Sequence, residues 1–307
     1  MKSAPNTPHL CNEAAAIQYV EARFWPDGPL CPHCGTIGEA TRLKGKSTRT
    51  GLWKCRACRK PFSVRMRSIF ESSHVPLHIW LQAIHLICSS KKGISTRQLQ
   101  RTLGGSMKTA WFLGHRIRLA MDGSSGSGPI GGSGKTVEAD ETFLSKSPKT
   151  RRIVGERANI QVLSLVERGG PLRSVFLDHN TVRSALWRHL DRDSPLVTDG
   201  SVVYRGFVRD HESVDHSKEE WAHGDVHTNT LEGFFSVFKR GLIGIYQHVE
   251  EQHLPRYLAE FDFRFNNRSK LGIDDAQRAD RALAGAKGKR LTYETTRRQE
   301  ALDTPPF

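Results

Sequence analysis

The chain has 307 residues, of which 37% are hydrophobic, and its formal net charge at pH 7 is +14. This length allows two or three domains that each bury a core, and the composition excludes an intrinsically disordered chain. The N-terminal segment lacks the apolar core of a signal peptide, and the longest uncharged stretch contains His and Gln residues and is too short to span a bilayer. We therefore expect a soluble, cytoplasmic protein with no membrane partner.

The positive charge is concentrated in the N-terminal part of the chain. Residues 1–122 contain 19 Lys and Arg against six Asp and Glu, a net charge of +13, whereas residues 123–307 contain 27 against 26, a net charge of +1. Ten Lys and Arg and no acid lie between residues 42 and 67. Such a run is typical of proteins that bind the phosphate backbone of nucleic acids, although a solvated basic face has the same composition.

The first motif is a pair of C-x2-C knuckles, CPHC and CRAC, separated by twenty residues. This is the spacing of a four-cysteine site for one structural Zn²⁺. Disulfides or a redox pair are the alternative, which a cytoplasmic location disfavours. With its aromatic and basic flanks, the motif predicts a zinc ribbon over residues 1–72. The expected zinc ligands are Cys31, Cys34, Cys55 and Cys58.

Three helices are predicted over residues 73–122. Apolar residues at helical spacing follow Pro76, and a second helix begins at Ser95, with Gln98 in the position of a capping box. Two glycines separate this helix from a third, and the short break suggests a DNA-binding helix-turn-helix. The basic residues expected to contact DNA are Lys54, Arg56, Arg59, Lys60, Arg65, Arg67, Lys108, Arg116 and Arg118.

A Gly- and Ser-rich segment follows the helices. The sequence SSGSGPIGGSG has no core-forming residue except Ile130. It is therefore predicted to be a flexible linker over residues 123–135, which divides the chain into two halves.

Beyond this segment the pattern changes to strands. Three β-rich runs, KTVEADETFL, ANIQVLSLVER and LRSVFLDHNT, precede a helix, a short strand PLVTDG and a further helix TLEGFFSVFKRG. Strands in series, followed by strands that alternate with helices, predict an α/β domain with a mixed sheet over residues 136–268. The polar segment 269–307 has no assigned role.

An acidic residue interrupts the apolar pattern of the last helix. Leu231, Phe234 and Phe238 share one face, and Glu232 lies at the edge of that face. The helix dipole alone can explain a glutamate in the first turn. Metal binding is the alternative, and it requires ligands from elsewhere in the chain.

Two further acids belong to the predicted strands. Asp140 lies inside the first strand, where a lone carboxylate is unfavourable, and Asp199 follows an apolar run, where turn chemistry also explains it. If these two acids converge with Glu232, three hard oxygen ligands form a site for Mg²⁺ or Mn²⁺, which suits two-metal cleavage of a phosphodiester. Glu141, next to Asp140, and Glu138, on the same strand face as Asp140, are the alternative ligands.

The motifs together resemble a known family. VEADETF, VTDGSVVYRGF, VHTNTLEGFFSVFKRGLIGIYQHV and YLAEFDFRFNNR, preceded by the zinc ribbon, resemble bacterial insertion-sequence transposases of the ISXO-like group, which carry a DDE domain. The resemblance covers residues 24–268. It implies an RNase H-like fold for the C-terminal half and assigns the DDE acids to Asp140, Asp199 and Glu232. It also makes His227 and Asn229 candidate neighbours of the active site.

The sequence therefore predicts a DNA transposase that cleaves transposon ends with Mg²⁺ and attacks target DNA with the freed 3′-hydroxyl. We expect the ribbon and the helical region to recognise the ends, and the chain to form a homo-oligomer on DNA in the bacterial nucleoid. One alternative is a zinc-ribbon transcription regulator with a non-catalytic C-terminal domain, which would bind DNA without cleaving it. The other is an RNase H-like nuclease, which would cut without joining strands.

Overall fold

The computed structural model describes residues 7–123, 128–145, 159–177, 181–214 and 228–292. The chain forms two compact units. The ribbon unit comprises residues 1–90, 94–121 and 273–307, and the sheet unit comprises residues 91–93 and 122–272. None of the helices within the described ranges is long and apolar enough to cross a membrane.

The ribbon unit begins with two helices and a small sheet. The helices are α1 (Pro8–Cys11) and α2 (Glu13–Phe24), and the three antiparallel strands, in the order β1-β2-β3, are β1 (Ala40–Arg42), β2 (Trp53–Cys55) and β3 (Pro61–Phe62). Helix α2, which is not among the helices predicted from the sequence, starts where the Asn12 side chain accepts a hydrogen bond from the backbone N–H of Ala15, at 3.0 Å. The small Ala16 is one of its buried residues, which weakens the apolar pattern in the sequence.

The three helices predicted over residues 73–122 are confirmed as α3 (Leu77–Ser89), α4 (Thr96–Leu103) and α5 (Met107–Met121). Ser95 is the N-cap of α4, and its hydroxyl accepts a hydrogen bond from the backbone N–H of Gln98 at 3.2 Å. Gly104 and Gly105 both have φ angles in the left-handed region, 78° and 80°, which glycine adopts without steric cost. They end α4 and turn the chain into α5.

The C-terminal segment belongs to the ribbon unit, although the sequence assigns it no role. Helix α10 (Asp275–Ala284) packs against α3 and α5. Buried Arg278 donates a hydrogen bond to the carbonyl oxygen of Cys88 at 2.9 Å, and Ala282 is fully buried. The segment's polar composition conceals this role, because an arginine and a small residue make much of the buried contact.

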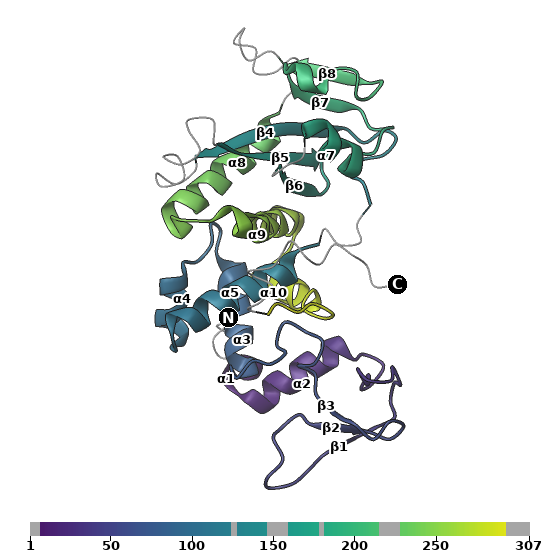
Figure 1. Cartoon of the computed structure of the whole chain (residues 1–307), viewed down its shortest axis with the longest axis vertical. Coiled ribbons are helices and arrows are strands. Elements are labelled where there is room, and N and C mark those ends of the chain that lie inside the picture. The colour runs from purple at the N-terminus through teal and green to yellow at the C-terminus, as the bar shows by residue number, and fades with distance from the viewer. Residues whose placement is uncertain (1–6, 124–127, 146–158, 178–180, 215–227, 293–307) are drawn as a thin grey trace. The chain divides into compact units, whose positions relative to one another are not determined.

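The sheet unit contains five strands in the order β6-β5-β4-β7-β8. They are β4 (Val137–Ser145), β5 (Asn159–Glu167), β6 (Leu172–Phe176), β7 (Leu196–Asp199) and β8 (His211–Val214). β4, β5 and β6 form an antiparallel meander, whereas β7 runs parallel to β4 and β8 runs parallel to β7. The predicted mixed α/β sheet is thereby confirmed (Figure 1).

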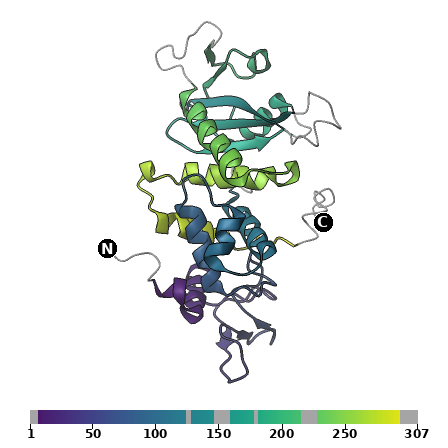
Figure 2. The ribbon, with the colours of Figure 1, turned by 90° about the vertical axis from the view of Figure 1, so that its left-hand side faces the viewer.

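Helices cover both faces of this sheet. α7 (Val182–His189) packs on one face, where Leu186 joins a core with Leu163 and Leu165 of β5. α8 (Asn229–Gly241) and α9 (Leu254–Asn266) pack on the other face, where Phe238 and Phe261 meet Val162 and Val166 of β5. Figure 2 shows α8, in green, laid across the sheet. Short turns of helix are η2 (Val202–Tyr204), η4 (Leu242–Tyr246), η5 (Glu251–His253) and η6 (Ser269–Leu271).

The prediction of a flexible linker is wrong for residues 128–135, which the structure describes. Ile130 is buried in the core beneath α7, its N–H donates to the carbonyl oxygen of His189 at 2.7 Å, and its carbonyl oxygen accepts from Asp191 N–H at 2.9 Å. Residues 128–135 are therefore part of the sheet unit, because one isoleucine and two backbone hydrogen bonds fix a segment that is otherwise Gly and Ser. Residues 124–127 lie outside the described ranges.

Candidate functional site

The four knuckle cysteines converge. Their sulfur atoms all lie within 4.8 Å of one another, with Sγ to Sγ distances of 3.6 Å for Cys31 and Cys58 and 3.6 Å for Cys34 and Cys55. A tetrahedron of sulfurs with Zn–S bonds of about 2.3 Å has edges of about 3.8 Å. The four thiols therefore fit one Zn²⁺ ion in both number and spacing.

The two knuckles share one backbone geometry. In each, the N–H of the first cysteine donates to the carbonyl oxygen five residues later, from Cys31 to Thr36 at 3.0 Å and from Cys55 to Lys60 at 3.1 Å. The residue after each second cysteine has a left-handed φ, 77° for Gly35 and 61° for Arg59. The two turns thus each direct two thiols at a common centre, and directly after CRAC the arginine Arg59 takes a conformation that favours glycine.

Three carboxylates form a second cluster where strand β7 ends beside the middle of the parallel strand β4. Ala139 of β4 pairs with Thr198 of β7, and this register places the next residues, Asp140 and Asp199, side by side. One oxygen each from Asp140, Asp199 and Glu141 lies within 4.8 Å of the other two, and all three side chains are half-buried. Hard oxygen donors at this spacing fit Mg²⁺ or Mn²⁺ better than Zn²⁺.

The strand pleat divides these acids between the two faces of the sheet. Val137 and Ala139 of β4 and Leu196 of β7 contribute to the core beneath α7. Because successive side chains alternate, Asp140 and Asp199 belong to the opposite face, which α8 covers. Glu141 belongs to the α7 face, and its carboxylate approaches the two aspartates at the point where β7 ends.

Glu141 has an environment that favours its protonated form. Burial, together with repulsion from Asp199 and Asp140, raises the pKa of Glu141 to about 7, against an opposing effect of the Tyr204 hydroxyl. Tyr204 is fully buried in η2, five residues after Asp199, and burial and these same carboxylates raise the pKa of its phenol. A neutral phenol beside a carboxylate can act only as a hydrogen-bond donor to it. No periodicity in the sequence pointed to Tyr204.

Glu232 lies outside the cluster formed by the described residues. It is exposed in the first turn of α8, on the helix that covers the face of Asp140 and Asp199. Asn229, the first residue of α8, is also exposed. His227 lies outside the described residues.

Glu138, one alternative ligand, has a structural role. Its side chain is fully buried, and its Oε1 accepts hydrogen bonds from Arg168 Nε at 3.1 Å and from Thr230 Oγ1 at 3.0 Å. Thr230 belongs to α8, so the buried carboxylate ties β4 to the start of the helix that carries Glu232. This use of Glu138 favours Asp140 as the ligand from β4.

The predicted DNA-contacting residues of the ribbon unit fall into two groups. Those with exposed side chains are Lys54, Arg56, Arg59, Lys60, Arg67 and Lys108. Lys108 lies in the first turn of α5, where Ser106 caps the helix through the N–H of Thr109 at 3.1 Å. The exposed group therefore comprises the second knuckle, the segment after it and the start of α5.

The prediction that Arg116 and Arg118 contact DNA is wrong, because both side chains are buried. Arg116 is 5% exposed and donates hydrogen bonds to the carbonyl oxygens of Ile69 at 2.8 Å, Glu71 at 2.9 Å and Leu291 at 3.1 Å. Arg118 is 3% exposed. The second half of α5 faces the core of the ribbon unit, so neither guanidinium is available to DNA.

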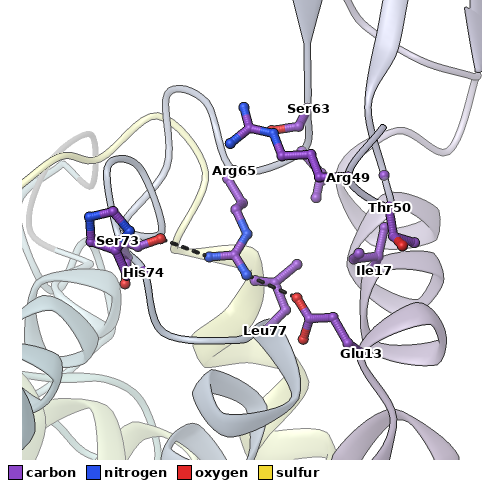
Figure 3. Close-up of a pocket in the computed structure, with 11 residues that line it drawn as sticks. Glu13, Ile17, Arg49, Thr50, Ser63, Arg65, Ser73, His74 and Leu77 are labelled. Atoms are coloured by element: carbon purple, nitrogen blue, oxygen red, sulfur yellow. Dashed lines mark hydrogen bonds and ion pairs between the residues drawn. The ribbon is translucent and has the colours of Figure 1, made fainter. Parts of the chain in front are cut away.

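Arg65 is also engaged within the ribbon unit, beside a cavity of about 330 Å³. Figure 3 shows its guanidinium between Glu13 and Ser73. It forms an ion pair with Glu13 at 2.9 Å and donates to the carbonyl oxygens of Ser73 at 3.2 Å and Val75 at 2.9 Å. Arg49 lines the same cavity and is the more exposed of these two arginines.

Comparison with known proteins gives two family matches. Residues 131–266 match the ISXO2-like transposase domain, and residues 11–61 match the transposase zinc-ribbon domain. A relative from Halobacterium salinarum, described as an uncharacterized protein in transposable element ISH50, is 27% identical over 273 residues, which cover 82% of this chain and 90% of that protein. No solved structure matches the chain.

Proposed function

Because this chain belongs to the insertion-sequence transposases with a zinc ribbon and an ISXO2-like transposase domain, we propose that it cleaves DNA at transposon ends and joins the freed 3′ ends to target DNA. The convergence of Asp140 and Glu141, in the middle of β4, with Asp199, at the end of β7, carries this proposal. The strand order β6-β5-β4-β7-β8, with a three-stranded meander and two parallel strands, supports an RNase H-like assignment for the sheet unit.

The catalytic roles follow from the two faces of the sheet. Asp140 and Asp199 would hold a divalent cation on the α8 face, and the position of Glu232 in the first turn of α8 supports it as the third ligand. Glu141, from the opposite face, is the other candidate. A bound Mg²⁺ or Mn²⁺ supplies an activated oxygen nucleophile and neutralises charge on the leaving oxygen.

The ribbon unit would recognise the DNA. The four clustered thiols would hold one structural Zn²⁺, and the α4–α5 pair, with its glycine turn and the exposed start of α5, supports a helix-turn-helix. Lys54, Arg56 and Lys60 surround the second knuckle and would contact phosphates. Because transposition requires two ends to be held together, the active form would be a homo-oligomer on DNA.

The pH dependence of metal binding tests whether Glu141 is a ligand of the cation. At pH values below the raised pKa of Glu141, a proton on its carboxylate competes with the cation. The affinity for Mn²⁺ should therefore increase from pH 5.5 to about pH 7 and level off above pH 7. The slope should approach tenfold per pH unit. Titration calorimetry with Mn²⁺ on the intact chain measures it.

Two variants provide the controls for this titration. Glu141→Gln should lose the rise around pH 7, whereas Tyr204→Phe, which removes an effect that lowers the pKa of Glu141, should move the midpoint to higher pH. The same pH profile for Glu141→Gln and the unmodified chain would mean that Glu141 does not contact the ion.

Salt dependence tests DNA binding by the exposed basic residues. If six to ten phosphates are contacted, affinity for duplex DNA should fall about 10³- to 10⁵-fold between 50 and 200 mM salt. The replacement Lys54→Ala should reduce the slope by about 0.9. Fluorescence anisotropy with the full chain measures both, and the full chain is required because residues 273–292 pack within the ribbon unit. Binding insensitive to salt would contradict an interface built on phosphates.

The decisive experiment is incubation of the purified chain with a labelled transposon-end duplex, with and without Mg²⁺. We expect both nicked and strand-joined products, and only with the metal. Binding without cleavage would favour a transcription regulator. Cleavage without joining would favour a nuclease of repair or RNA metabolism.

A further inference from the structure

A second candidate site lies on the α7 side of the sheet unit, away from the acid-bearing α8 face. The outer surface of α7 and the loop after η2 line an open cavity of about 590 Å³, within the range of about 300 to 1,000 Å³ that is usual for ligand sites. Its principal lining residues are Arg183, Trp187, Arg188, Arg192 and Phe207.

The aromatic part of this cavity is exposed. Trp187 has 64% of its surface accessible, and the Phe207 ring packs edge-on against it with centroids 6.5 Å apart. The guanidinium of Arg192 lies 3.1 Å from the centroid of the Trp187 ring. A large flat ring left open to solvent is unusual in a core-forming helix, and here it already holds a planar cation on one face.

The charged part of the cavity lacks compensating acids. Among the described residues, no carboxylate pairs with Arg183, Arg188 or Arg192, and no acid lines the cavity. Arg183 is fixed by hydrogen bonds to the carbonyl oxygens of Val203 at 3.2 Å and Arg205 at 3.1 Å. Three arginines that line one cavity without a paired carboxylate favour an anionic ligand, and their planar donors suit phosphate oxygens.

We propose that this cavity binds a single-stranded segment of DNA, with phosphates on Arg183, Arg188 and Arg192 and an unpaired base stacked on the Trp187–Arg192 pair. A duplex hides the faces of its bases, so an accessible stacking platform is useful only to an unpaired base. Phe207 follows Tyr204 of η2 by three residues, and Tyr204 is buried against the acid cluster, so this short segment connects the cavity to the cleavage site.

The charge of the surface argues against a second copy of the chain as the occupant. A self-complementary contact would bring the three arginines of one copy against those of the other, with no acid in the lining to offset the repulsion. A polyanion has no such cost. The choice of DNA as the ligand rests on the proposed function. The preference for a single strand with a stacked base rests on the exposed Trp187 ring and the arginines that line the cavity.

The test is a titration of intrinsic tryptophan fluorescence with a twelve-nucleotide oligothymidylate, using the full chain without divalent metal. A quench that Trp187→Phe removes would report stacking at this position among the six tryptophans of the chain. In the double variant Arg188→Ala/Arg192→Ala we expect weaker binding and a salt slope smaller by about 1.4, from about 0.7 for each lost phosphate contact on a single strand. Lys270→Ala, which removes an exposed cation of the sheet unit outside the cavity, should change neither quantity.

Three results would overturn the proposal. The first is a quench that does not depend on Trp187, and the second is an equal quench with a twelve-base-pair duplex. The third is that replacement of Trp187 changes the sedimentation mass but leaves DNA binding unchanged, which would indicate a protein interface. The outcome is separable from the proposed catalysis, because an Asp140→Asn chain that no longer cleaves DNA should keep the quench.

Discussion

Asp140→Asn and Asp199→Asn should each abolish both cleavage and strand transfer while the fold and DNA binding survive. Both side chains are half-buried members of the carboxylate cluster, and an amide cannot provide the negative charge that a divalent cation requires. Because one metal site would serve both chemical steps in the proposed mechanism, each rate should fall by at least about a thousand-fold. The double variant should lose little more than either single one, because residues that act as a unit are non-additive. Single-turnover assays with a labelled end duplex measure both steps.

The same assay identifies the third acid. If Glu232 is the ligand from α8, Glu232→Gln should match the aspartate variants, whereas a purely structural glutamate in the first turn predicts a stability loss of about 0.3 to 1 kcal/mol with cleavage intact. Glu141→Gln is the parallel test for the α7 face, and Glu212→Gln, an exposed carboxylate on β8, is the matched control. Near-normal cleavage by folded Glu232→Gln protein would remove Glu232 from the catalytic trio.

Removal of zinc should have the largest effect on stability. Structural zinc sites contribute about 10 to 16 kcal/mol of apparent binding free energy, far more than a three-stranded sheet of two- and three-residue strands can replace. A strong chelator should therefore unfold the ribbon and abolish DNA binding by the ribbon unit, while the core of the sheet unit persists. Circular dichroism and DNA binding, followed during chelation, measure these two effects.

A matched pair of variants completes this test. Cys31→Ser should reproduce the effect of the chelator, whereas Cys11→Ser, at an exposed cysteine outside the cluster, should leave zinc content and DNA binding unchanged. Native protein with four free knuckle thiols and no bound zinc would refute the zinc assignment.

Most of the secondary structure and the zinc knuckles can be predicted from the sequence pattern. Strand β4 and helix α8 follow their hydrophobic periodicity, and the two knuckles follow their cysteine spacing. The proximity of Asp140 and Asp199 needs a further step, since it depends on the parallel register of β4 with β7, and fifty residues separate these two strands in the sequence. Periodicity identifies both strands but carries no information about which strands pair.

The residues whose roles were predicted wrongly or missed have one physical feature in common, which is contact with residues far away in the sequence. Arg116 resembles a surface arginine in the sequence, yet its partners include Leu291, 175 residues away. Ile130 resembles part of a linker, but it is buried beneath α7. Tyr204 gains its significance only from the burial of its phenol beside Glu141. In each case burial is imposed by another part of the chain, and no local pattern encodes it.

The inclusion of α10 in the ribbon unit has a consequence for synthesis of the protein. Residues 273–292 are translated after the whole sheet unit, yet they pack against α3 and supply an acceptor for Arg116. At about 5 to 20 residues per second, the ribosome completes the ribbon unit only some ten seconds or more after its first helices emerge. A chain interrupted before α10 would therefore lack part of the packing of its ribbon unit. If this unit recognises DNA as proposed, prematurely terminated products would compete poorly with full-length protein for transposon ends.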